Sequence, residues 1–387
     1  MTSNASPRRL ITRPPRHWAD LDAAGRRDAI KQVGLPPFRA DQVSRHYFER
    51  CETDPGLWSD LPATGRASIK GFFPLLLTQL RRGIGDHGLT AKSLYRLHDN
   101  VLVEAVLMRY PKSVPNPDSD EPIDQARSTL CLSTQAGCGI GCPFCATGQA
   151  GLTRNLSAAE MVEQVRLAKM DLKAGGLEGG SGGLNNLVLM GMGEPLANYQ
   201  SVMTAIAAIT DASPNGFGLS ARGVTVSTSG LVPRIADLAG EGRPLTLAVS
   251  LHAPDDALRD ELVPLNRRFP VASLLDAARD YFEATGRRVS IEYALMRDIN
   301  DQVGRAVELA RQLNRRGRGW VHVNLIPLNP TPGSVWTASR HRDQQAFITA
   351  LEQARVPVTL RHTRGADIDG ACGQLAARYR RDGAAPS

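Results

Sequence analysis

Apolar and polar residues follow two different periods along the chain, and the change between them divides the sequence into parts. Near the start, apolar residues recur every three or four positions in "LDAAGRRDAIKQVG" (21–34) and "RADQVSRHYFERC" (39–51), which predicts short amphipathic helices. "KSLYRLHDNVLVEAVLMRY" (92–110) instead alternates like two strands that turn at Asp99-Asn100. The first part of the chain is therefore predicted to be a helical module followed by a small β extension.

From Thr129 onward, short β-rich apolar runs alternate with amphipathic helical runs. The predicted strands include "STLCLST" (128–134), "NNLVLMGMG" (185–193), "GVTVSTSG" (223–230), "PLTLAVSLH" (244–252), "RVSIEYALM" (288–296) and "WVHVNLIPLNP" (320–330). Sustained strand–helix alternation predicts a parallel sheet covered by helices. Six or seven such units are too few for a closed eight-fold barrel, so the expected fold is α/β with a partial (β/α)6-type barrel.

The same patterns suggest a division into domains. "PKSVPNPDSDEPIDQ" (111–125) is rich in Pro and Asp and marks a boundary, while "AGGLEGGSGGL" (174–184) is expected to be a flexible glycine-rich linker. The predicted parts are a disordered basic tail (1–18), a helical accessory domain (19–92), a β extension with a linker loop (93–125), a partial barrel (126–380) and a tail (381–387).

Composition and charge narrow the class of protein. The chain of 387 residues is 42% hydrophobic, enough for a large core, yet no apolar stretch approaches the length of a membrane span. The first residues lack the apolar region of a signal peptide, so we expect a cytoplasmic protein. A net charge of +7 suits either an RNA partner or an ordinary basic surface. Six cysteines in a chain of this length suggest metal-binding or reactive thiols in a reducing compartment.

Cys138, Cys142 and Cys145 are spaced as C-x3-C-x2-C on the loop after the first predicted barrel strand. A structural zinc site needs four ligands and usually has two C-x2-C pairs, whereas only Cys142 and Cys145 form such a pair. Three thiolates can hold a four-iron cluster, whose usual complement is four cysteines, and leave one iron open. This is the pattern of radical S-adenosylmethionine (SAM) enzymes, in which the open iron binds the methionine part of SAM, and Phe144 offers an apolar ring to shield the cluster.

Glycine and polar residues follow several predicted barrel strands, as in "GMGEP", "STSG", "SLHAP" and "NPTPG". The carboxyl ends of parallel barrel strands meet at one rim, where active sites form. Gly191 and Gly193 allow close approach of a ligand to the backbone, and Glu194 offers a carboxylate to an ammonium group. The sequence therefore predicts one site at this rim.

The chain resembles the RlmN/Cfr-type family of radical SAM RNA methyltransferases over about residues 90–380. The resemblance lies in six ordered motifs: "CLSTQAGCGIGCPFCATG", "GMGEPLAN", "VTVSTSGLVP", "SLHAP", "VNLIPLNP" and "RGADIDGACGQL". It implies a [4Fe-4S] cluster on Cys138, Cys142 and Cys145, and SAM as the second cofactor. It also implies SAM contacts at Gly193, Glu194, Ser227, Ser250, Leu251, His252 and Asn329, although His252 by itself would be interpreted as a core histidine.

The resemblance further implies a methylated-cysteine mechanism. Carbon 2 of adenine is electron-poor, so a direct attack on the electrophilic methyl group of SAM fails, whereas a thiolate is methylated easily. Cys372 would carry the methyl group, a second SAM would supply a 5′-deoxyadenosyl radical, and Cys131 would release the product by forming a disulfide with Cys372. Glu104 would take the ring proton, although strand alternation alone predicts it to be an exposed carboxylate. Cys51 has no predicted role.

The expected activity is methylation of carbon 2 of adenosine in 23S rRNA and tRNA, with a flavodoxin- or ferredoxin-type electron donor and a monomeric protein. Two alternatives stay open at this point. The same chemistry could act on carbon 8, as in Cfr, or the chain could be a zinc-stabilised RNA-binding protein without catalysis. Both methyltransferase activities, on carbon 2 or on carbon 8, predict a brown protein with four irons. The RNA-binding protein without catalysis predicts a colourless protein with one zinc.

Overall fold

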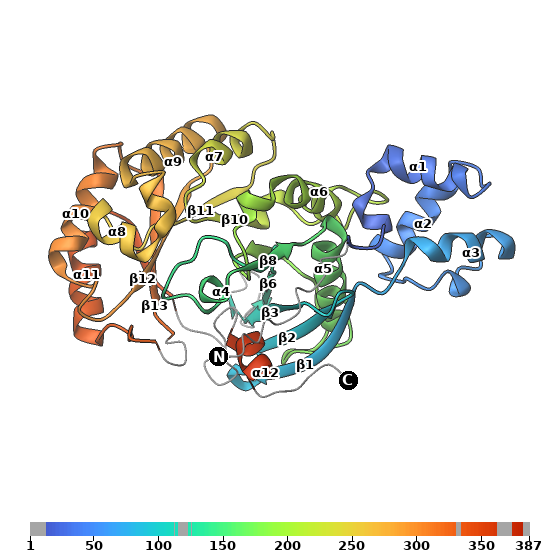
Figure 1. The fold of residues 1–387 in the computed structure, drawn as a ribbon, viewed down its shortest axis with the longest axis horizontal. Helices are drawn as coiled ribbons and strands as arrows, with labels where there is room; N and C mark the ends of the chain where they lie inside the picture. Colours follow the sequence, from blue (N-terminus) through green and yellow to red (C-terminus); the bar gives the residue numbers. More distant parts are fainter. Residues whose placement is uncertain are drawn as a thin grey trace, which may run out of the picture.

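The computed structural model describes residues 13–111, 113–114, 123–124, 126–329, 334–361 and 374–381. A ten-stranded sheet forms its centre, with the strand order β1-β2-β3-β6-β9-β10-β11-β12-β13-β14. Helices cover the outer face of the barrel part of this sheet, and a small helical lobe lies at the opposite end of the molecule (Figure 1). In this described part, no helix is long and apolar enough to cross a bilayer.

The helical lobe forms around clustered aromatic side chains. Trp18, Tyr47 and Trp58 are fully buried, and each packs against the ring of Phe73. The elements of the lobe are the helices α1 (Ala23–Gln32), α2 (Arg39–Phe48) and α3 (Ala63–Ile69) and the short 3₁₀ turns η1 (Trp18–Asp20), η2 (Pro55–Leu57) and η3 (Lys70–Phe72). The two predicted helices are thus confirmed, and large rings give this small module its core.

Polar contacts fix the lobe to helix α5 (Ala158–Lys173) of the barrel. The hydroxyl of Tyr47 donates to a carboxylate oxygen of Glu163 at 2.6 Å, and Arg166 donates to both oxygens of the same carboxylate at 2.8 Å each. The backbone N–H of Ala159 donates to Asp20 at 2.8 Å. Because these groups are largely buried, the lobe is held rigidly against the barrel.

Three antiparallel strands extend the barrel sheet rather than forming a separate layer. Strands β1 (Leu77–Gly85), β2 (Thr90–Leu97) and β3 (Leu102–Tyr110) pair in order, and β3 pairs antiparallel with the first barrel strand, β6 (Arg127–Cys131). The predicted hairpin is confirmed. The predicted exposure of Glu104 is wrong, because both faces of β3 are covered and this side chain is 3% exposed.

Seven parallel strands follow, which confirms the partial barrel. They are β6, β9 (Asn186–Leu189), β10 (Val224–Thr228), β11 (Thr246–Ser250), β12 (Val289–Leu295), β13 (Val321–Pro327) and β14 (Val358–Leu360). The connecting helices are α5, α6 (Tyr199–Thr210), α7 (Val232–Ala239), α8 (Asp256–Leu262), α9 (Val271–Thr285), α10 (Val303–Asn314) and α11 (His341–Gln353). Apolar side chains such as Leu247, Ile291 and Val323 bury one face of these strands against the helices.

The remaining elements are short. Two-residue strands β4 (Ser113–Val114) and β5 (Ile123–Asp124) pair with each other. Strand β7 (Gln135–Gly137) pairs with β8 (Leu152–Asn155) around the cysteine loop, which also holds α4 (Ala146–Gln149). The 3₁₀ turns η4 (Asp86–Gly88), η5 (Pro195–Asn198), η6 (Ala221–Gly223) and η7 (Pro264–Arg267) lie in connections. Helix α12 (Gln374–Arg381) ends the described chain beside β1 and β2 (Figure 1).

The glycine-rich segment 174–184 is not the flexible linker that the sequence suggests. Arg109 donates to the carbonyl oxygens of Glu178 at 3.2 Å and Gly180 at 2.6 Å, and the N–H of Glu178 donates to Gly88 at 2.9 Å. Leu177 is buried. The glycines therefore serve a loop that packs closely over the turn between β1 and β2.

The division into domains stays a prediction, although two of its limits fall inside packed segments. Trp18, the last residue of the predicted tail, begins η1 and is fully buried. The limit at residue 92 falls within β2, because the β extension already starts with β1 at Leu77. Sequence periodicity missed β1 because its residues Arg81-Arg82-Gly83 interrupt the alternation.

Candidate active site

The cysteine motif lies at the tip of a hairpin that projects from the end of β6. Strands β7 and β8 form the base of this hairpin, and the N–H of Cys138 donates to the carbonyl oxygen of Gly151 at 3.0 Å. Gly137 has φ +84°, and a Cβ atom at this position would lie 1.9 Å from the same carbonyl oxygen. Only glycine fits here, so the sequence "AGCGIGC" is what lets the hairpin close tightly behind the first cysteine.

The three thiols are partly buried and form no disulfide. Burial raises the pKa of Cys138 to about 11 and raises that of Cys142 still further. Coordination to iron would offset this cost, because a metal stabilises the thiolate form. In the part of the chain that the structure describes, no three His, Cys, Asp or Glu side chains converge on a single metal position. A four-iron cluster does not require its ligands to converge on one point, because each thiolate binds a different iron.

Phe144, between the last two cysteines, packs against His252 at the end of β11. Their ring centroids are 5.1 Å apart at an interplanar angle of 82°. His252 has φ +61°, and its Nδ1 atom accepts a hydrogen bond from the N–H of Ala294 at 3.0 Å, which assigns the proton to Nε2. Burial, assisted by the charge of Arg259, lowers the pKa of His252 to about 3. The imidazole is therefore neutral, and it joins the cysteine loop to the strand ends of the barrel.

Gly193 and Glu194 lie in the loop that follows β9, against the start of the cysteine hairpin. Gly193 has φ +110°, and a Cβ atom there would come within 2.7 Å of the backbone nitrogen of Gln135. The carboxylate of Glu194 accepts from the N–H of Ser229 at 2.7 Å and from that of Leu196 at 3.2 Å. Burial raises the pKa of Glu194. The carboxylate thus joins the loops after β9 and β10 in addition to any ligand contact.

The other predicted SAM contacts lie at or just after the carboxyl ends of the strands. Ser227 of β10 donates to the carbonyl oxygen of Leu189 at 2.5 Å. Leu251 is fully buried, and its N–H donates to the carbonyl oxygen of Glu292 at 3.0 Å, so it would contact a ligand through its backbone. Ser250, the last residue of β11, and Asn329, two residues after β13, are half-buried. The structure therefore brings these residues to one edge of the sheet, while their contacts with SAM stay a prediction.

Sequence analysis missed a polar row that crosses the same face. Glu292 of β12 is the register partner of both Ser250 of β11 and Asn324 of β13. Its carboxylate accepts from the Ser290 hydroxyl at 2.6 Å and from the Asn324 amide at 2.7 Å, and burial raises its pKa. The sequence contains a pattern that could have revealed this row, because polar residues occupy every second position in "VSIEY" and "VHVNL". This periodicity marks the concave face of the barrel.

Glu104 and Cys131 lie on the same face of neighbouring strands. Cys131 of β6 is the register partner of Val106 of β3, and Glu104 lies two residues before Val106. Lys92 of β2 is also a partner of Val106, and its Nζ atom lies 2.9 Å from Glu104 Oε2. Both Glu104 and Cys131 are buried. The structure thus brings the proposed proton acceptor and the proposed releasing thiol to one side of the extended sheet.

Cys372 lies outside the described residues. Helix α12 begins two residues later in the sequence, and the N–H of Ala376 in its first turn donates to Glu104 Oε1 at 2.6 Å. The side chain of Ala376 is buried with Leu94 and Leu102, on the face that carries Glu104. The segment that follows Cys372 is therefore attached to the predicted catalytic face.

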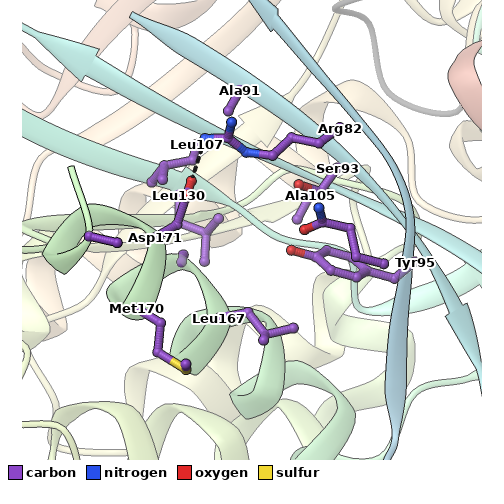
Figure 2. Close-up of a pocket in the computed structure, with 13 residues that line it drawn as sticks. Arg82, Ala91, Ser93, Tyr95, Ala105, Leu107, Leu130, Leu167, Met170 and Asp171 are labelled. Atoms are coloured by element: carbon purple, nitrogen blue, oxygen red, sulfur yellow. Dashed lines mark hydrogen bonds and ion pairs between the residues drawn. The ribbon is translucent and has the colours of Figure 1, made fainter. Parts of the chain in front are cut away.

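A pocket of about 310 Å³ lies on the opposite face of the same strands and contains none of the predicted site residues. Figure 2 shows Ser93, Ala105 and Leu107 lining it, and these residues alternate along β2 and β3 with Lys92, Glu104 and Val106. The ion pair between Arg82 and Asp171, with an N–O distance of 2.8 Å, forms part of the lining (Figure 2). This pocket separates β1–β3 from α5 and is distinct from the candidate active site.

Comparison with known proteins agrees with this arrangement. Residues 132–310 match the family model of the Radical SAM superfamily. The chain is 59% identical over 373 residues to a protein of Cutibacterium acnes described as a probable dual-specificity RNA methyltransferase RlmN, covering 96% of this chain and 90% of that protein. A protein of Streptomyces coelicolor with the same description is 54% identical, covering 96% and 97%. The crystal structure of a radical SAM methyltransferase from Sphaerobacter thermophilus superposes with a TM-score of 0.84 at 42% identity, covering 93% of this chain and 99% of that one.

Proposed function

The chain belongs to the RlmN family of radical SAM RNA methyltransferases, and we propose that it methylates carbon 2 of adenosine in 23S rRNA and in tRNA. As a member of this family it uses a [4Fe-4S] cluster and SAM. One structural observation carries the proposal for this chain's own residues. The polar strand ends and the face with Glu104 and Cys131 lie on adjoining strands of one continuous sheet, and the cysteine hairpin projects from the end of β6 in that sheet.

We assign the cluster to Cys138, Cys142 and Cys145. These three thiolates would hold the cluster, which when bound would supply the electron for one-electron chemistry on SAM. The chain's part is to hold SAM in place at the rim through Gly193, Glu194 and the other strand-end residues: Ser227, Ser250, Leu251, His252 and Asn329. The neutral His252 and the apolar ring of Phe144 close the side of the site next to the cysteine loop, and this exclusion of water protects a reactive radical.

Cys372 and Cys131 would form a relay. The Cys372 thiolate attacks the methyl group of SAM, forms a sulfur–carbon bond and releases S-adenosylhomocysteine. A 5′-deoxyadenosyl radical from the second SAM would take a hydrogen atom from this methyl group, and the carbon would add to the base, whose adduct then loses one electron to the cluster and its ring proton. The Cys131 thiolate would next attack the sulfur of Cys372, so that a disulfide forms as the sulfur–carbon bond breaks and the released carbon takes up a proton. Glu104 takes the proton from the ring carbon. The ion pair between Lys92 Nζ and Glu104 Oε2, at 2.9 Å, fixes the position of this carboxylate on the face that also carries Cys131, which supports this role.

RNA would bind through the helical lobe together with the open side of the sheet. Basic residues of the lobe, such as Arg27, Arg45 and Lys70, are exposed, and the rigid attachment of the lobe to α5 would fix its position relative to the active site. Contacts with phosphates make binding sensitive to salt. The target adenosine must be unpaired or extruded from its stack, because carbon 2 of an adenine within an RNA double helix is inaccessible to the enzyme. We also propose a monomer in the cytoplasm that receives electrons from a flavodoxin- or ferredoxin-type donor.

The test is an anaerobic reaction of the reconstituted protein with SAM, a reductant and unmodified 23S rRNA or tRNA, followed by digestion and mass analysis of the nucleosides. We expect 2-methyladenosine from both RNAs. Formation of 8-methyladenosine would place the protein with Cfr, and the absence of any methylated adenosine from a protein with four irons would overturn the substrate assignment. A colourless protein with one zinc would overturn the cofactor assignment.

A further inference from the structure

Arg259 of α8 is the most deeply buried guanidinium in the described part of the barrel, with no exposed surface. Its Nε atom donates to the carbonyl oxygen of Leu251 at 3.0 Å. Its Nη2 atom donates to the carbonyl oxygens of Ser229 at 2.8 Å and Ser250 at 3.1 Å. These carbonyls belong to the segments that end β10 and β11. One side chain thus joins two adjacent strand ends at the rim where SAM is expected.

No carboxylate among the described residues forms a direct ion pair with this guanidinium. Its remaining hydrogen bond, from Nη1, goes to the neutral amide of Asn266 at 2.9 Å. The Nδ2 atom of that amide in turn donates to Asp256 at 3.0 Å and to Asp260 at 2.6 Å, so two carboxylates lie one step further away. Burying a cation without a direct counter-charge is costly, and burial lowers the pKa of Arg259 to about 10. The site therefore favours an added anion.

The cysteine loop lies next to this cation. Leu258, the neighbour of Arg259 on α8, packs in one apolar cluster with Cys142 and Phe144. His252, which follows the Leu251 whose carbonyl oxygen accepts from Arg259, packs against Phe144 of this loop with ring centroids 5.1 Å apart. The anion expected near the Arg259 guanidinium is a cluster bound through three thiolates. Such a cluster carries net negative charge, and it gains one further negative charge on reduction.

We propose that Arg259 is a positioning residue that supplies the buried positive charge for the cluster and fixes the strand-end carbonyls at the SAM site. The proposal rests on the assignment of the cluster to Cys138, Cys142 and Cys145. Its charge stabilises the reduced cluster relative to the oxidised one, because the interaction strengthens as the cluster becomes more negative. Its forked hydrogen bonds hold Ser229, Ser250 and Leu251 in one arrangement, which a single ammonium group could not reproduce.

Three variants of the full-length, cluster-containing protein separate charge from position. Arg259→Gln removes the charge, and Arg259→Lys keeps the charge but loses most of the hydrogen bonds. Arg287→Gln is the matched control, because Arg287 hydrogen-bonds the carbonyl of Arg222 and the hydroxyl of Thr246 at the opposite end of β11. The measurements are iron content, the reduction midpoint by electron paramagnetic resonance during a redox titration, and the SAM dissociation constant in anaerobic equilibrium binding.

For Arg259→Gln with four irons bound, we expect the ratio of reduced to oxidised cluster at a fixed potential to fall about tenfold, which corresponds to a midpoint about 59 mV lower. For Arg259→Lys, the ratio of reduced to oxidised cluster at the same potential should stay within about threefold of the wild-type value. This variant should bind SAM about tenfold more weakly than the wild type. Arg287→Gln should change neither quantity. These readouts do not depend on methyl transfer, so they distinguish the role of Arg259 from the identity of the RNA product.

An unchanged midpoint in Arg259→Gln with a full cluster overturns the proposal, as does an equal fall in both Arg259 variants. If the Arg259→Gln protein does not retain four irons, the Arg259→Lys protein tests the proposal instead. Four irons with a wild-type midpoint support the charge-based account, whereas loss of the cluster in this variant as well contradicts it. A wild-type protein without four irons would instead overturn the cofactor assignment itself.

Discussion

The Nζ atom of Lys92 lies 2.9 Å from a carboxylate oxygen of Glu104, and both side chains are withdrawn from solvent, with exposed fractions of 0% and 3%. The second carboxylate oxygen accepts the N–H of Ala376 in α12. Residues from β2, β3 and α12 thus meet at one carboxylate. Removing one member of a buried ion pair leaves the other charge uncompensated and typically costs about 3–5 kcal/mol.

We therefore predict that Lys92→Met lowers the free energy of unfolding by about 3–5 kcal/mol. The double variant Lys92→Met/Glu104→Met should lose clearly less than the sum of the two single variants, because no unpaired charge is left buried. Urea denaturation of the four proteins measures this coupling. Additive losses would contradict the account, and so would a Lys92→Met protein as stable as the wild type.

The closure of the cysteine hairpin depends on Gly137. We predict that Gly137→Ala sharply reduces iron content, because its Cβ would clash with the Gly151 carbonyl oxygen at 1.9 Å. Gly141→Ala is the control: Gly141 has a similar φ of +77° but no atom within 4 Å of an added Cβ. Its cost should be limited to the strain of about 1–2 kcal/mol of a left-handed residue. Iron analysis and visible absorbance after identical reconstitution compare the two, and equal iron loss would contradict the role of this contact.

Protonation of His252 should destabilise the folded protein in acid. Its folded-state pKa is lowered to about 3 from 6.5, so its contribution to stability is present above pH 6.5 and is lost as the pH falls towards 3. Between these values the unfolded chain binds the extra proton, and stability changes by about 1.4 kcal/mol per pH unit for this group.

The variant His252→Gln should therefore show a flatter dependence of unfolding free energy on pH within this window. His17, whose pKa burial lowers to about 4, contributes a similar slope and remains in both proteins. Urea denaturation at several pH values between 6.5 and 4.5 measures the difference. Parallel curves for wild type and variant would contradict a buried, neutral His252.

Sequence patterns predicted those parts of the site that depend on neighbours in the chain. The three-thiol loop, the strand-end glycines and the partial barrel follow from short spacings and sustained periodicity. The burial of Glu104 could not be predicted in this way, because the backbone that caps it comes from Ala376, 272 residues later. Arg259 was missed for a related reason. It occurs in "DDALRDELV", which is typical of a solvent-facing helix, and only the packing of α8 against β11 shows that its charge is buried.

The two-cysteine relay is the central claim about mechanism, and Cys131→Ala tests it most directly. The protein is incubated anaerobically with methyl-labelled SAM, a reductant and RNA, and then analysed by denaturing electrophoresis and mass spectrometry. Cys51→Ala is the control, because Cys51 is likewise buried but lies in the helical lobe, where its carbonyl oxygen accepts from Arg166 at 2.9 Å. We predict that Cys131→Ala accumulates labelled RNA covalently attached to Cys372, whereas Cys51→Ala releases methylated RNA like the wild type. Free methylated RNA released by Cys131→Ala at the wild-type rate, without an adduct, would contradict the relay.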